Sequence, residues 1–289
     1  MKKRKAKSTS EDQYDTFSIT MELEKPLLYN EGDNLDKKKQ IKKEADSKKL
    51  KKGIMTLLVV IVLFVAGFFI WLSNGYKLES NSLSYLESDS DVKVTIKDKN
   101  IYFTPNSINA VKGFIFYPGE RVDVSSYAKL GKKIASYGYE VVLVDMPFDY
   151  SSFGKDKATE IIKNNDNIEN WVIGGDSLGG SVACKYALNN KNVDGVILIS
   201  SYPTDNISDL GIEVLSISGS KDDVIDYNKL INSKDKLPTD TNYVEIEGAN
   251  HSQFGSYGLY SGDGEALISE DEQIDMSAKK IVNFLYNIQ

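Results

Sequence analysis

Hydrophobic and polar positions follow a regular order over the last two thirds of the chain. Short, continuously apolar runs, typical of strands buried on both faces of a parallel sheet, alternate with segments of helical periodicity. We expect strands at residues 92–96, 101–103, 113–117, 140–145, 171–173, 195–199, 214–217 and 243–246. We expect helices at residues 124–137, 155–164, 178–189, 226–233 and 270–286. The pattern predicts an α/β fold with a mostly parallel, doubly wound sheet.

One segment near the amino terminus has no polar face. Residues 54–72, IMTLLVVIVLFVAGFFIWL, contain no charge, and Thr56 is their single polar side chain. At about 1.5 Å per residue, a helix of this length spans roughly 28 Å, which matches the hydrocarbon core of a bilayer. A buried globular helix is usually shorter and has a polar stripe, and a cleavable signal peptide lies closer to the start of the chain. The segment therefore predicts one uncleaved transmembrane helix.

Charge is distributed unevenly on the two sides of this segment. Residues 1–53 hold 15 of the 35 Lys and Arg and 10 of the 42 Asp and Glu side chains, with a lysine cluster at residues 37–52. By the positive-inside rule this side is cytoplasmic, so we expect a single-pass protein of the cell membrane with its larger part outside. Residues 54–289 carry the remaining 20 basic and 32 acidic groups, a net charge of −12, which repels nucleic acid.

Composition divides the chain into four parts. Residues 1–53 are polar and poor in apolar side chains, so we expect a largely disordered cytoplasmic tail. Residues 54–72 form the anchor, and residues 73–91, rich in Ser and Asn, are expected to form a spacer. Residues 92–289 form the predicted extracellular domain. The single cysteine of the chain permits no internal disulfide, so this domain must be held together by its core.

A glycine-rich turn joins the predicted strand at residues 171–173 to the helix at residues 178–189. Its sequence GDSLG places glycine two residues before and two residues after Ser177, which fits the G-x-S-x-G pattern of a nucleophile on a tight turn. Such a turn lifts the hydroxyl to a helix N-terminus, whose dipole favours negative charge. No G-x-G-x-x-G and no Gly-Lys-Ser/Thr is present, which argues against a nucleotide-binding loop. Ser177 is therefore a candidate nucleophile.

The chain contains one histidine, His251. Activation of a serine hydroxyl near neutral pH ordinarily needs a base such as imidazole. His251 lies in a loop directly after the last predicted strand, at residues 243–246. We therefore expect His251 to be the general base.

A carboxylate is also needed to orient the imidazole. Asp222 and Asp223 follow the predicted strand at residues 214–217, and both are candidates. Asp223 could instead cap the next helix. Should neither act, Asp205 or Asp209 after the preceding strand remains. The chain order Ser, Asp, His is the order of this fold and differs from that of the chymotrypsin and subtilisin types.

From about residue 95 to its end, the chain resembles the α/β-hydrolase superfamily, specifically the compact alpha/beta hydrolase fold-5 group related to the dienelactone hydrolases. Beyond the Ser177 turn, the matching pieces are residues 116–123 (FYPGERVD), 248–258 (GANHSQFGSYG) and 262–269 (GDGEALIS). In that family the acid follows a Gly-x-x-Asp pattern, which maps onto Gly219 and Asp222. The resemblance thus implies a triad of Ser177, Asp222 and His251.

The resemblance also implies an oxyanion hole made by two backbone amides. One is that of Leu178, and the other is that of Gly119 or Glu120; family members commonly have a second glycine where this chain has Glu120. Dienelactone hydrolases use a cysteine nucleophile. Cys184, however, lies seven residues beyond Ser177 on the predicted helix, where a packed core thiol is expected.

The connection between the strands at residues 195–199 and 214–217 is too short for the helical cap of many relatives, so we expect an open site. Aromatic side chains on the surrounding loops are candidate substrate contacts or plain packing residues: Phe148, Tyr202 and Phe254. We expect a serine hydrolase that cleaves a small-molecule acyl substrate through an acyl-enzyme, without metal or cofactor. An ester is the default substrate, and thioester, lactone and amide remain open. The alternative is a catalytically silent surface protein that uses the fold for binding.

The lysine cluster on one side of residues 54–72 leads to a testable topology. Protease added to intact cells should remove the predicted extracellular domain and spare residues 1–53, because only the domain is expected outside. Immunoblotting with antibodies against each part checks this. Digestion of the tail with sparing of the domain would reverse the orientation.

Overall fold

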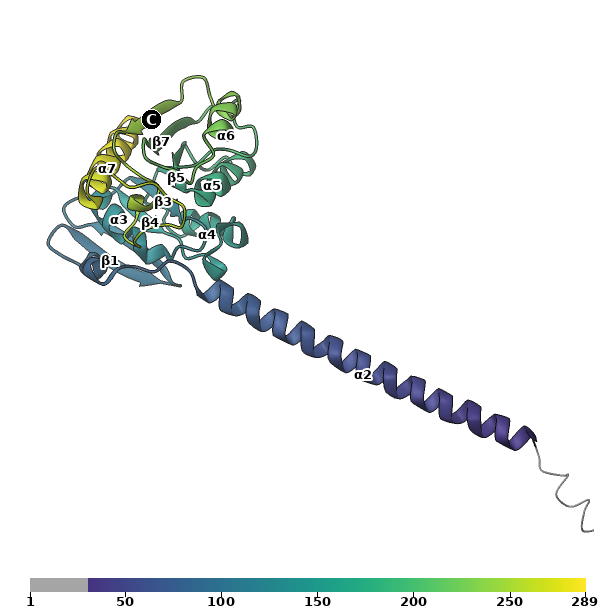
Figure 1. Cartoon of the computed structure of the whole chain (residues 1–289). Coiled ribbons are helices and arrows are strands. Elements are labelled where there is room, and N and C mark those ends of the chain that lie inside the picture. The colour runs from purple at the N-terminus through teal and green to yellow at the C-terminus, as the bar shows by residue number, and fades with distance from the viewer. Residues whose placement is uncertain (1–30) are drawn as a thin grey trace, which may run out of the picture. The chain divides into compact units, whose positions relative to one another are not determined.

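The computed structural model describes residues 31–289, and the chain divides into two compact units, Met1–Phe68 and Phe69–Gln289. Helix α2 covers Glu31–Ser73 (Figure 1). Within Gly32–Trp71, a stretch of 18 residues reaches a mean hydropathy of 2.9, so the helix is long and apolar enough to cross a membrane. Its described side chains are exposed throughout, unlike those of a core helix.

The predicted disorder of residues 1–53 is wrong for residues 31–53, which belong to helix α2. These residues are mainly Lys, Glu, Asp, Gln, Leu and Ala, most of which favour helix. Once the apolar stretch has formed a helix, each added residue gains a backbone hydrogen bond without a new nucleation step. Residues 1–30 of the predicted tail lie outside the described residues.

The predicted spacer is also more structured than its composition suggested. The Tyr76 amide donates to the Arg121 carbonyl at 2.7 Å, and the Asp123 amide donates to the Tyr76 carbonyl at 2.9 Å. The short helix η2, Ser80–Leu86, follows. Tyr76, Tyr85 and Leu86 pack against the domain core, which explains the order of an otherwise polar segment. The domain therefore includes residues that precede residue 92.

Eight strands form one sheet: β1 Val92–Lys97, β2 Asn100–Pro105, β3 Lys112–Tyr117, β4 Glu140–Leu143, β5 Asn170–Asp176, β6 Gly195–Ile199, β7 Glu213–Gly219 and β8 Asn242–Ile246. Their order is β1-β2-β4-β3-β5-β6-β7-β8. The pairs β1–β2 and β2–β4 are antiparallel, and the other five pairs are parallel. The predicted mostly parallel α/β fold is thus confirmed.

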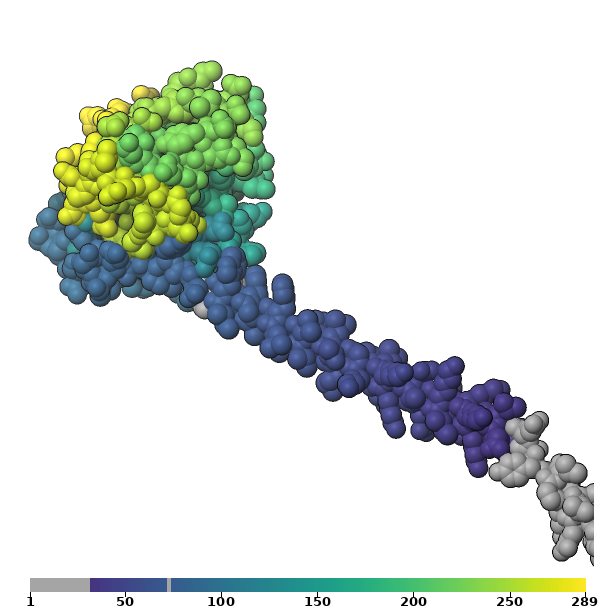
Figure 2. Space-filling model, in the orientation of Figure 1, coloured from purple at the N-terminus to yellow at the C-terminus, as the bar shows by residue number. Residues whose placement is uncertain are grey.

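Helices connect the strands: η3 Val124–Tyr127, α3 Ala128–Ala135, η4 Pro147–Asp149, η5 Ser151–Gly154, α4 Lys157–Lys163, α5 Leu178–Asn189, α6 Tyr227–Asn232, η6 Lys234–Lys236, η7 Ser252–Phe254 and α7 Glu270–Asn287. No helix or strand lies between β6 and β7 in the described chain, as expected for a fold without a cap. Helix α7 begins with a capping box of Ser269 and Glu272 and packs against α3. In the space-filling view the yellow C-terminal segment lies at the surface of the domain (Figure 2).

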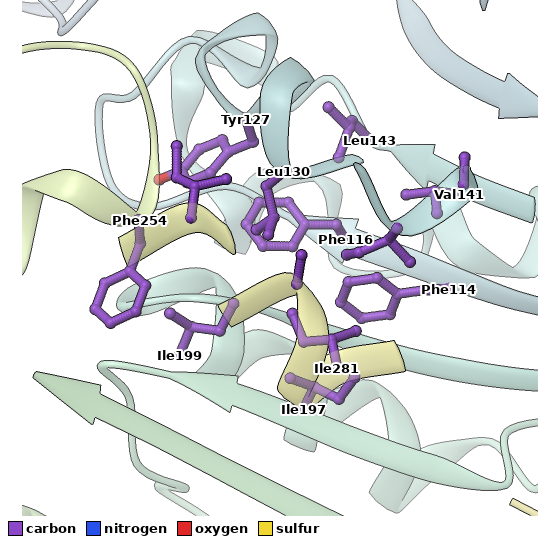
Figure 3. Close-up of a cluster of buried hydrophobic side chains, with 14 of the residues drawn as sticks. Phe114, Phe116, Tyr127, Leu130, Val141, Leu143, Ile197, Ile199, Phe254 and Ile281 are labelled. Atoms are coloured by element: carbon purple, nitrogen blue, oxygen red, sulfur yellow. The ribbon is translucent and has the colours of Figure 1, made fainter. Parts of the chain in front are cut away.

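Two apolar clusters fill the two faces of the sheet. On one face, residues of alternate register pack against α3 and α7, and Figure 3 shows members of this cluster: Phe114, Phe116, Leu130, Ile197 and Ile281. On the other face, Ile115, Ile173 and Leu198 pack with Ala183 and Cys184 of α5. Strands covered on both sides must be apolar at every position, which explains their continuous hydrophobic runs.

The parallel strands carry the loops of interest at one edge of the sheet. Strands β5, β7 and β8 run in the same direction, so their carboxyl ends meet at the same edge. In open α/β sheets, sites form at this edge. The turn after β5 carries Ser177, the loop after β7 carries Asp222, and the loop after β8 carries His251.

Glu140, at the start of β4, provides a test of core electrostatics. Its side chain is buried and accepts a hydrogen bond from the Thr104 hydroxyl at 3.1 Å. Burial raises its pKa from 4.5 to about 7, and the Thr104 bond only partly opposes this. The folded state therefore binds more protons between these values, and stability is lost as the pH rises through this window.

Replacing Glu140 with Gln should remove this loss while keeping a carbonyl acceptor for Thr104. We expect the free energy of unfolding to rise by on the order of 2 kcal/mol at pH 8 and to change little at pH 4. Urea titrations of the full chain in detergent, followed by near-UV circular dichroism, measure this. Equal stability of the two proteins at pH 8 would contradict the prediction.

Candidate active site

The turn between β5 and α5 holds Ser177 in an unusual backbone conformation. Its φ is 50° and its ψ is −119°, a region that costs an L-residue about 1–3 kcal/mol. The Ser177 amide donates to the Ile199 carbonyl of β6 at 2.9 Å, and the Ser201 hydroxyl donates to the Ser177 carbonyl at 2.5 Å. Ser177 itself remains partly exposed. The strained turn is therefore fixed from two sides while its side chain stays accessible.

The two glycines that flank Ser177 allow this turn to pack against β3. A Cβ atom added at Gly175 would lie 2.3 Å from the Tyr117 carbonyl oxygen, and one at Gly179 would lie 2.2 Å from the same atom. Real Cβ atoms never come so close to backbone. The spacing of glycine around the serine is thus required by the close approach of strand, turn and helix.

Asp222 and His251 form a buried pair. His251 Nδ1 and Asp222 Oδ2 are 2.9 Å apart, and the residues are 2% and 1% exposed. The other oxygen, Asp222 Oδ1, accepts from the amides of Val224 and Ile225, each at 2.9 Å. The neighbouring Asp223 is exposed. Of the two candidate acids, the structure brings Asp222 to the imidazole. Asp205 and Asp209 instead accept hydrogen bonds from their neighbours Thr204 and Ser208.

Charges around His251 shift its protonation. Burial lowers its pKa, but the hydrogen bond to Asp222 and the negative charges of Asp176, Asp222 and Asp263 outweigh burial and raise it to about 8. For Asp222, burial raises the pKa, but its hydrogen bond and Coulomb attraction to His251 prevail and lower it. The surroundings therefore stabilise a charged imidazole beside an ionised carboxylate, and the neutral imidazole that can act as a base predominates above a pH of about 8.

Asp176, the residue before the candidate nucleophile, is fully buried next to this pair. Its Oδ2 accepts from the Tyr127 hydroxyl at 2.7 Å, and its Oδ1 has no partner among the described residues. Burial raises the pKa of Asp176 to about 6, against the attraction of His251 and the bond from Tyr127. The Tyr127 oxygen in turn accepts from the Gly119 amide at 3.2 Å. A buried chain thus links the Ser177 turn to the loop after β3.

This chain of bonds bears on which amide of that loop, Gly119 or Glu120, is free to act as the second oxyanion donor. Because the Gly119 amide already donates to Tyr127, it is engaged inside the protein. The side chain of Glu120 accepts from the Tyr150 hydroxyl at 2.8 Å. Leu178 is the first residue of α5, where the amide has no partner within the helix, and it lines the cavity at Ser177.

Ser177 and His251 open into one cavity of about 380 Å³. The rest of its wall is lined by Leu178, Ser181, Ser200, Ser201, Tyr202, Thr204, Val224, Ile225, Asp226 and Lys229. A larger cavity of about 860 Å³ lies elsewhere. Asp209 lines it, but Ser177, Asp222 and His251 do not. The smaller cavity is the candidate active site because it is the one that combines nucleophile and base.

The three expected substrate contacts have different positions. Tyr202 lines the cavity, as expected. The prediction of a substrate contact is wrong for Phe254, because this residue is fully buried in the apolar cluster of Figure 3 and does not reach the cavity. Phe148 is 57% exposed and also lies outside the cavity, with its ring 6.1 Å from that of Phe153. An aromatic residue in a loop can point inward or outward, and periodicity does not decide between the two.

Sequence reasoning missed several residues around the site. Asp176 was visible as the second letter of GDSLG, and Asp263 lies in the segment GDGEALIS, but neither pattern signals an electrostatic effect on the imidazole. The Tyr260 ring lies 5.6 Å from that of His251, and Lys229 lines the cavity. The arrangement can support acyl transfer by a serine, with an imidazole as base and a carboxylate behind it.

Comparisons with known proteins agree with the fold. The model of the alpha/beta hydrolase family matches residues 113–275, more than half of the chain. A structure described as a predicted CIB-like hydrolase from Thermoplasma acidophilum is 15% identical, with a TM-score of 0.51, and the match covers 66% of this chain and 99% of that one. The structure titled Est1E from Butyrivibrio proteoclasticus is 12% identical, with a TM-score of 0.49, and the match covers 68% of this chain and 98% of that one. No curated protein matches the chain.

The single histidine makes the charge environment measurable. In the full chain labelled with ¹³C-histidine, the one Cε1 resonance should titrate with a pKa of about 8. Asp222→Asn should lower this pKa by roughly one unit or more, because the raising effect of the carboxylate is lost and the lowering effect of burial remains. Asp223→Asn, at the exposed neighbouring acid, is the matched control and should leave the titration unchanged. A normal pKa in the unaltered protein would argue against the buried pair.

Proposed function

Because the chain belongs to the alpha/beta hydrolase family, we propose that it is a membrane-anchored serine hydrolase that cleaves ester-type carbonyl substrates through an acyl-enzyme. The observation that carries the proposal is the buried Asp222–His251 pair, whose histidine lines the same cavity as Ser177. A silent binding protein would have no need to hold its one histidine against a buried carboxylate beside a strained serine turn.

In the proposed reaction Ser177 attacks the carbonyl carbon and His251 takes the hydroxyl proton. Because Nδ1 of the imidazole is bonded to Asp222, Nε2 is the nitrogen left to accept this proton and to return it to the leaving group. Asp222 keeps the ring oriented and stabilises its charged form. In the second half of the reaction, His251 takes a proton from water while the water oxygen attacks the acyl-enzyme. His251 then returns this proton to Ser177 as the acid product is released.

Negative charge on the carbonyl oxygen needs two donors. We assign one to the Leu178 amide, at the start of α5, where the helix dipole also favours an anion. For the second donor we favour the amide of Glu120 over that of Gly119, because the Gly119 amide already donates to the Tyr127 hydroxyl. In this assignment Asp176 and Tyr127 hold the loop through the Gly119 amide, and the Glu120 amide is left to donate to the substrate.

The size and lining of the cavity favour a small acyl group. A volume of about 380 Å³ is near the low end for small-molecule sites. Leu178, Tyr202, Val224 and Ile225 supply apolar surface, and the other lining side chains are mainly hydroxyls with Asp226 and Lys229. An ester is the default substrate because its leaving group is easier to expel than an amine. Neither metal nor cofactor enters the proposed mechanism.

The proposed location follows from helix α2 and its flanking charges. Its apolar stretch would cross the cell membrane once, and the lysines before it would keep the amino terminus in the cytoplasm. The domain that carries Ser177 would then act on molecules outside the cell.

The proposal is tested by labelling and turnover. The full chain in detergent should react with a fluorophosphonate probe and hydrolyse 4-nitrophenyl esters, with acetate and butyrate preferred over long chains. Ser177→Ala should abolish labelling and lower kcat roughly a thousandfold or more, because no other activated hydroxyl is expected.

Ser152→Ala, at an exposed serine of η5, is the matched control and should label normally. Normal folding of the protein together with absence of labelling would favour the binding-protein alternative. Labelling that persists in Ser177→Ala would remove the assignment of the nucleophile.

A further inference from the structure

We propose that Asp263 is a positioning residue that fastens the loop of His251 to the loop of Asp222 and adds to the negative field on the imidazole. The inference rests on the proposed function, since it concerns the same site. Asp263 belongs to the segment GDGEALIS, which has no role in the mechanism described so far.

The carboxylate of Asp263 receives an unusually large set of hydrogen bonds. Its Oδ1 accepts from the amides of His251 at 3.2 Å and Gly264 at 2.8 Å, and its Oδ2 accepts from the amide and hydroxyl of Ser252 at 2.8 and 2.5 Å. A longer bond, of 3.4 Å, reaches Oδ1 from the amide of Asp223. One side chain thus contacts the residue after Asp222, the base itself and the residue after the base.

These bonds replace a helix cap. His251 stands at the start of the short helix η7 and makes no side-chain cap bond of its own. The first amides of any helix lack partners within it. Asp263, which is 12 residues further along the chain, accepts from the amides of His251 and Ser252 and so fixes the direction in which the imidazole leaves the backbone.

The loop that carries Asp263 lies directly on the loop of the acid. A Cβ atom at Gly264 would lie 2.3 Å from the Lys221 carbonyl oxygen and 3.0 Å from Asp223 Oδ2. The Asn250 side chain donates to the Gly264 carbonyl at 2.9 Å, and the Tyr260 amide donates to the Ser252 hydroxyl at 2.8 Å. Glycine after Asp263 is therefore what lets this segment sit against both functional loops.

The geometry matters because the Asp222–His251 bond joins loops from two different strands. Its 2.9 Å length depends on the relative position of those loops, and Asp263 is bonded to both. A displacement of about 1 Å in a catalytic group can lower turnover on the order of 100-fold. Asp263 would therefore act on kcat through His251, without contact with substrate.

The charge of Asp263 gives a second, separable effect. The ionisable groups acting on His251 are the carboxylates of Asp222, Asp176 and Asp263, and the Tyr260 ring packs nearby. Removing the negative charge of Asp263 weakens the field that favours the imidazolium ion. The pH at which the base becomes neutral should then fall, whereas loss of packing alone has no preferred direction.

The test compares three variants of the full chain in detergent. Asp263→Asn removes the charge and one acceptor oxygen. Ser252→Ala removes one donor to Asp263 and the acceptor of the Tyr260 amide, and keeps the charge. Glu265→Gln removes an exposed charge two residues away and is the matched control. The measurements are kcat and KM with 4-nitrophenyl acetate, the pH profile of kcat/KM, and the His251 Cε1 titration.

We expect Asp263→Asn to lower kcat 10- to 100-fold with KM within about twofold, and to move the pH profile and the His251 titration to lower pH. Ser252→Ala should lower kcat a few fold without moving the titration, and Glu265→Gln should match the unaltered protein. An unchanged titration in Asp263→Asn, or a downward shift of equal size in Glu265→Gln, overturns the proposal.

Two further outcomes are decided in advance. If Asp263→Asn fails to fold, Ser252→Ala still tests the positioning role, because an unaltered kcat in that variant contradicts the expected loss of a few fold and overturns it. If the unaltered protein neither labels nor turns over ester, the proposed function fails. The histidine titration, which needs no activity, then still tests whether Asp263 acts on His251.

Discussion

The left-handed backbone of Ser177 is the constraint on which the rest of the domain depends. The turn that holds Ser177 at a φ of 50° packs against β3 at Gly175 and Gly179. Its serine amide donates to a backbone carbonyl of β6. Three neighbouring strands and α5 therefore converge on one residue. The conformation costs about 1–3 kcal/mol, which the two apolar clusters on the faces of the sheet offset.

A second constraint is the charge that this packing encloses. The carboxylates of Asp176, Asp222 and the half-buried Asp263 all raise the pKa of one imidazole, and a carboxylate away from water is stable only when it is bonded, paired or protonated. Each acid meets this condition differently: Asp222 by the histidine and two amides, Asp263 by several amides, and Asp176 by Tyr127 together with a raised pKa. The site therefore stores negative charge that favours the imidazolium ion formed during acyl transfer.

The order of strands and helices could be predicted because buried strands and amphipathic helices have different periods, and helix α5 and strand β6 begin and end where the pattern indicated. The glycines around Ser177 and the single histidine indicated the site before any geometry. Loop side chains such as Phe254 could not be placed, since their direction depends on tertiary packing. The same holds for Asp263, whose partners other than the adjacent Gly264 lie 11 to 40 residues away in the chain. It also holds for residues 31–53, whose helix continues from an apolar neighbour.

Cys184 gives the domain a property unrelated to its charges. The only sulfhydryl group of the chain lies fully buried on α5, and burial raises its pKa to about 12. A thiol that is neither ionised nor accessible exchanges with no disulfide and is protected from oxidation. The fold can therefore be reached without oxidative cross-linking or isomerase assistance. Its stability should also be the same in reducing and oxidising surroundings.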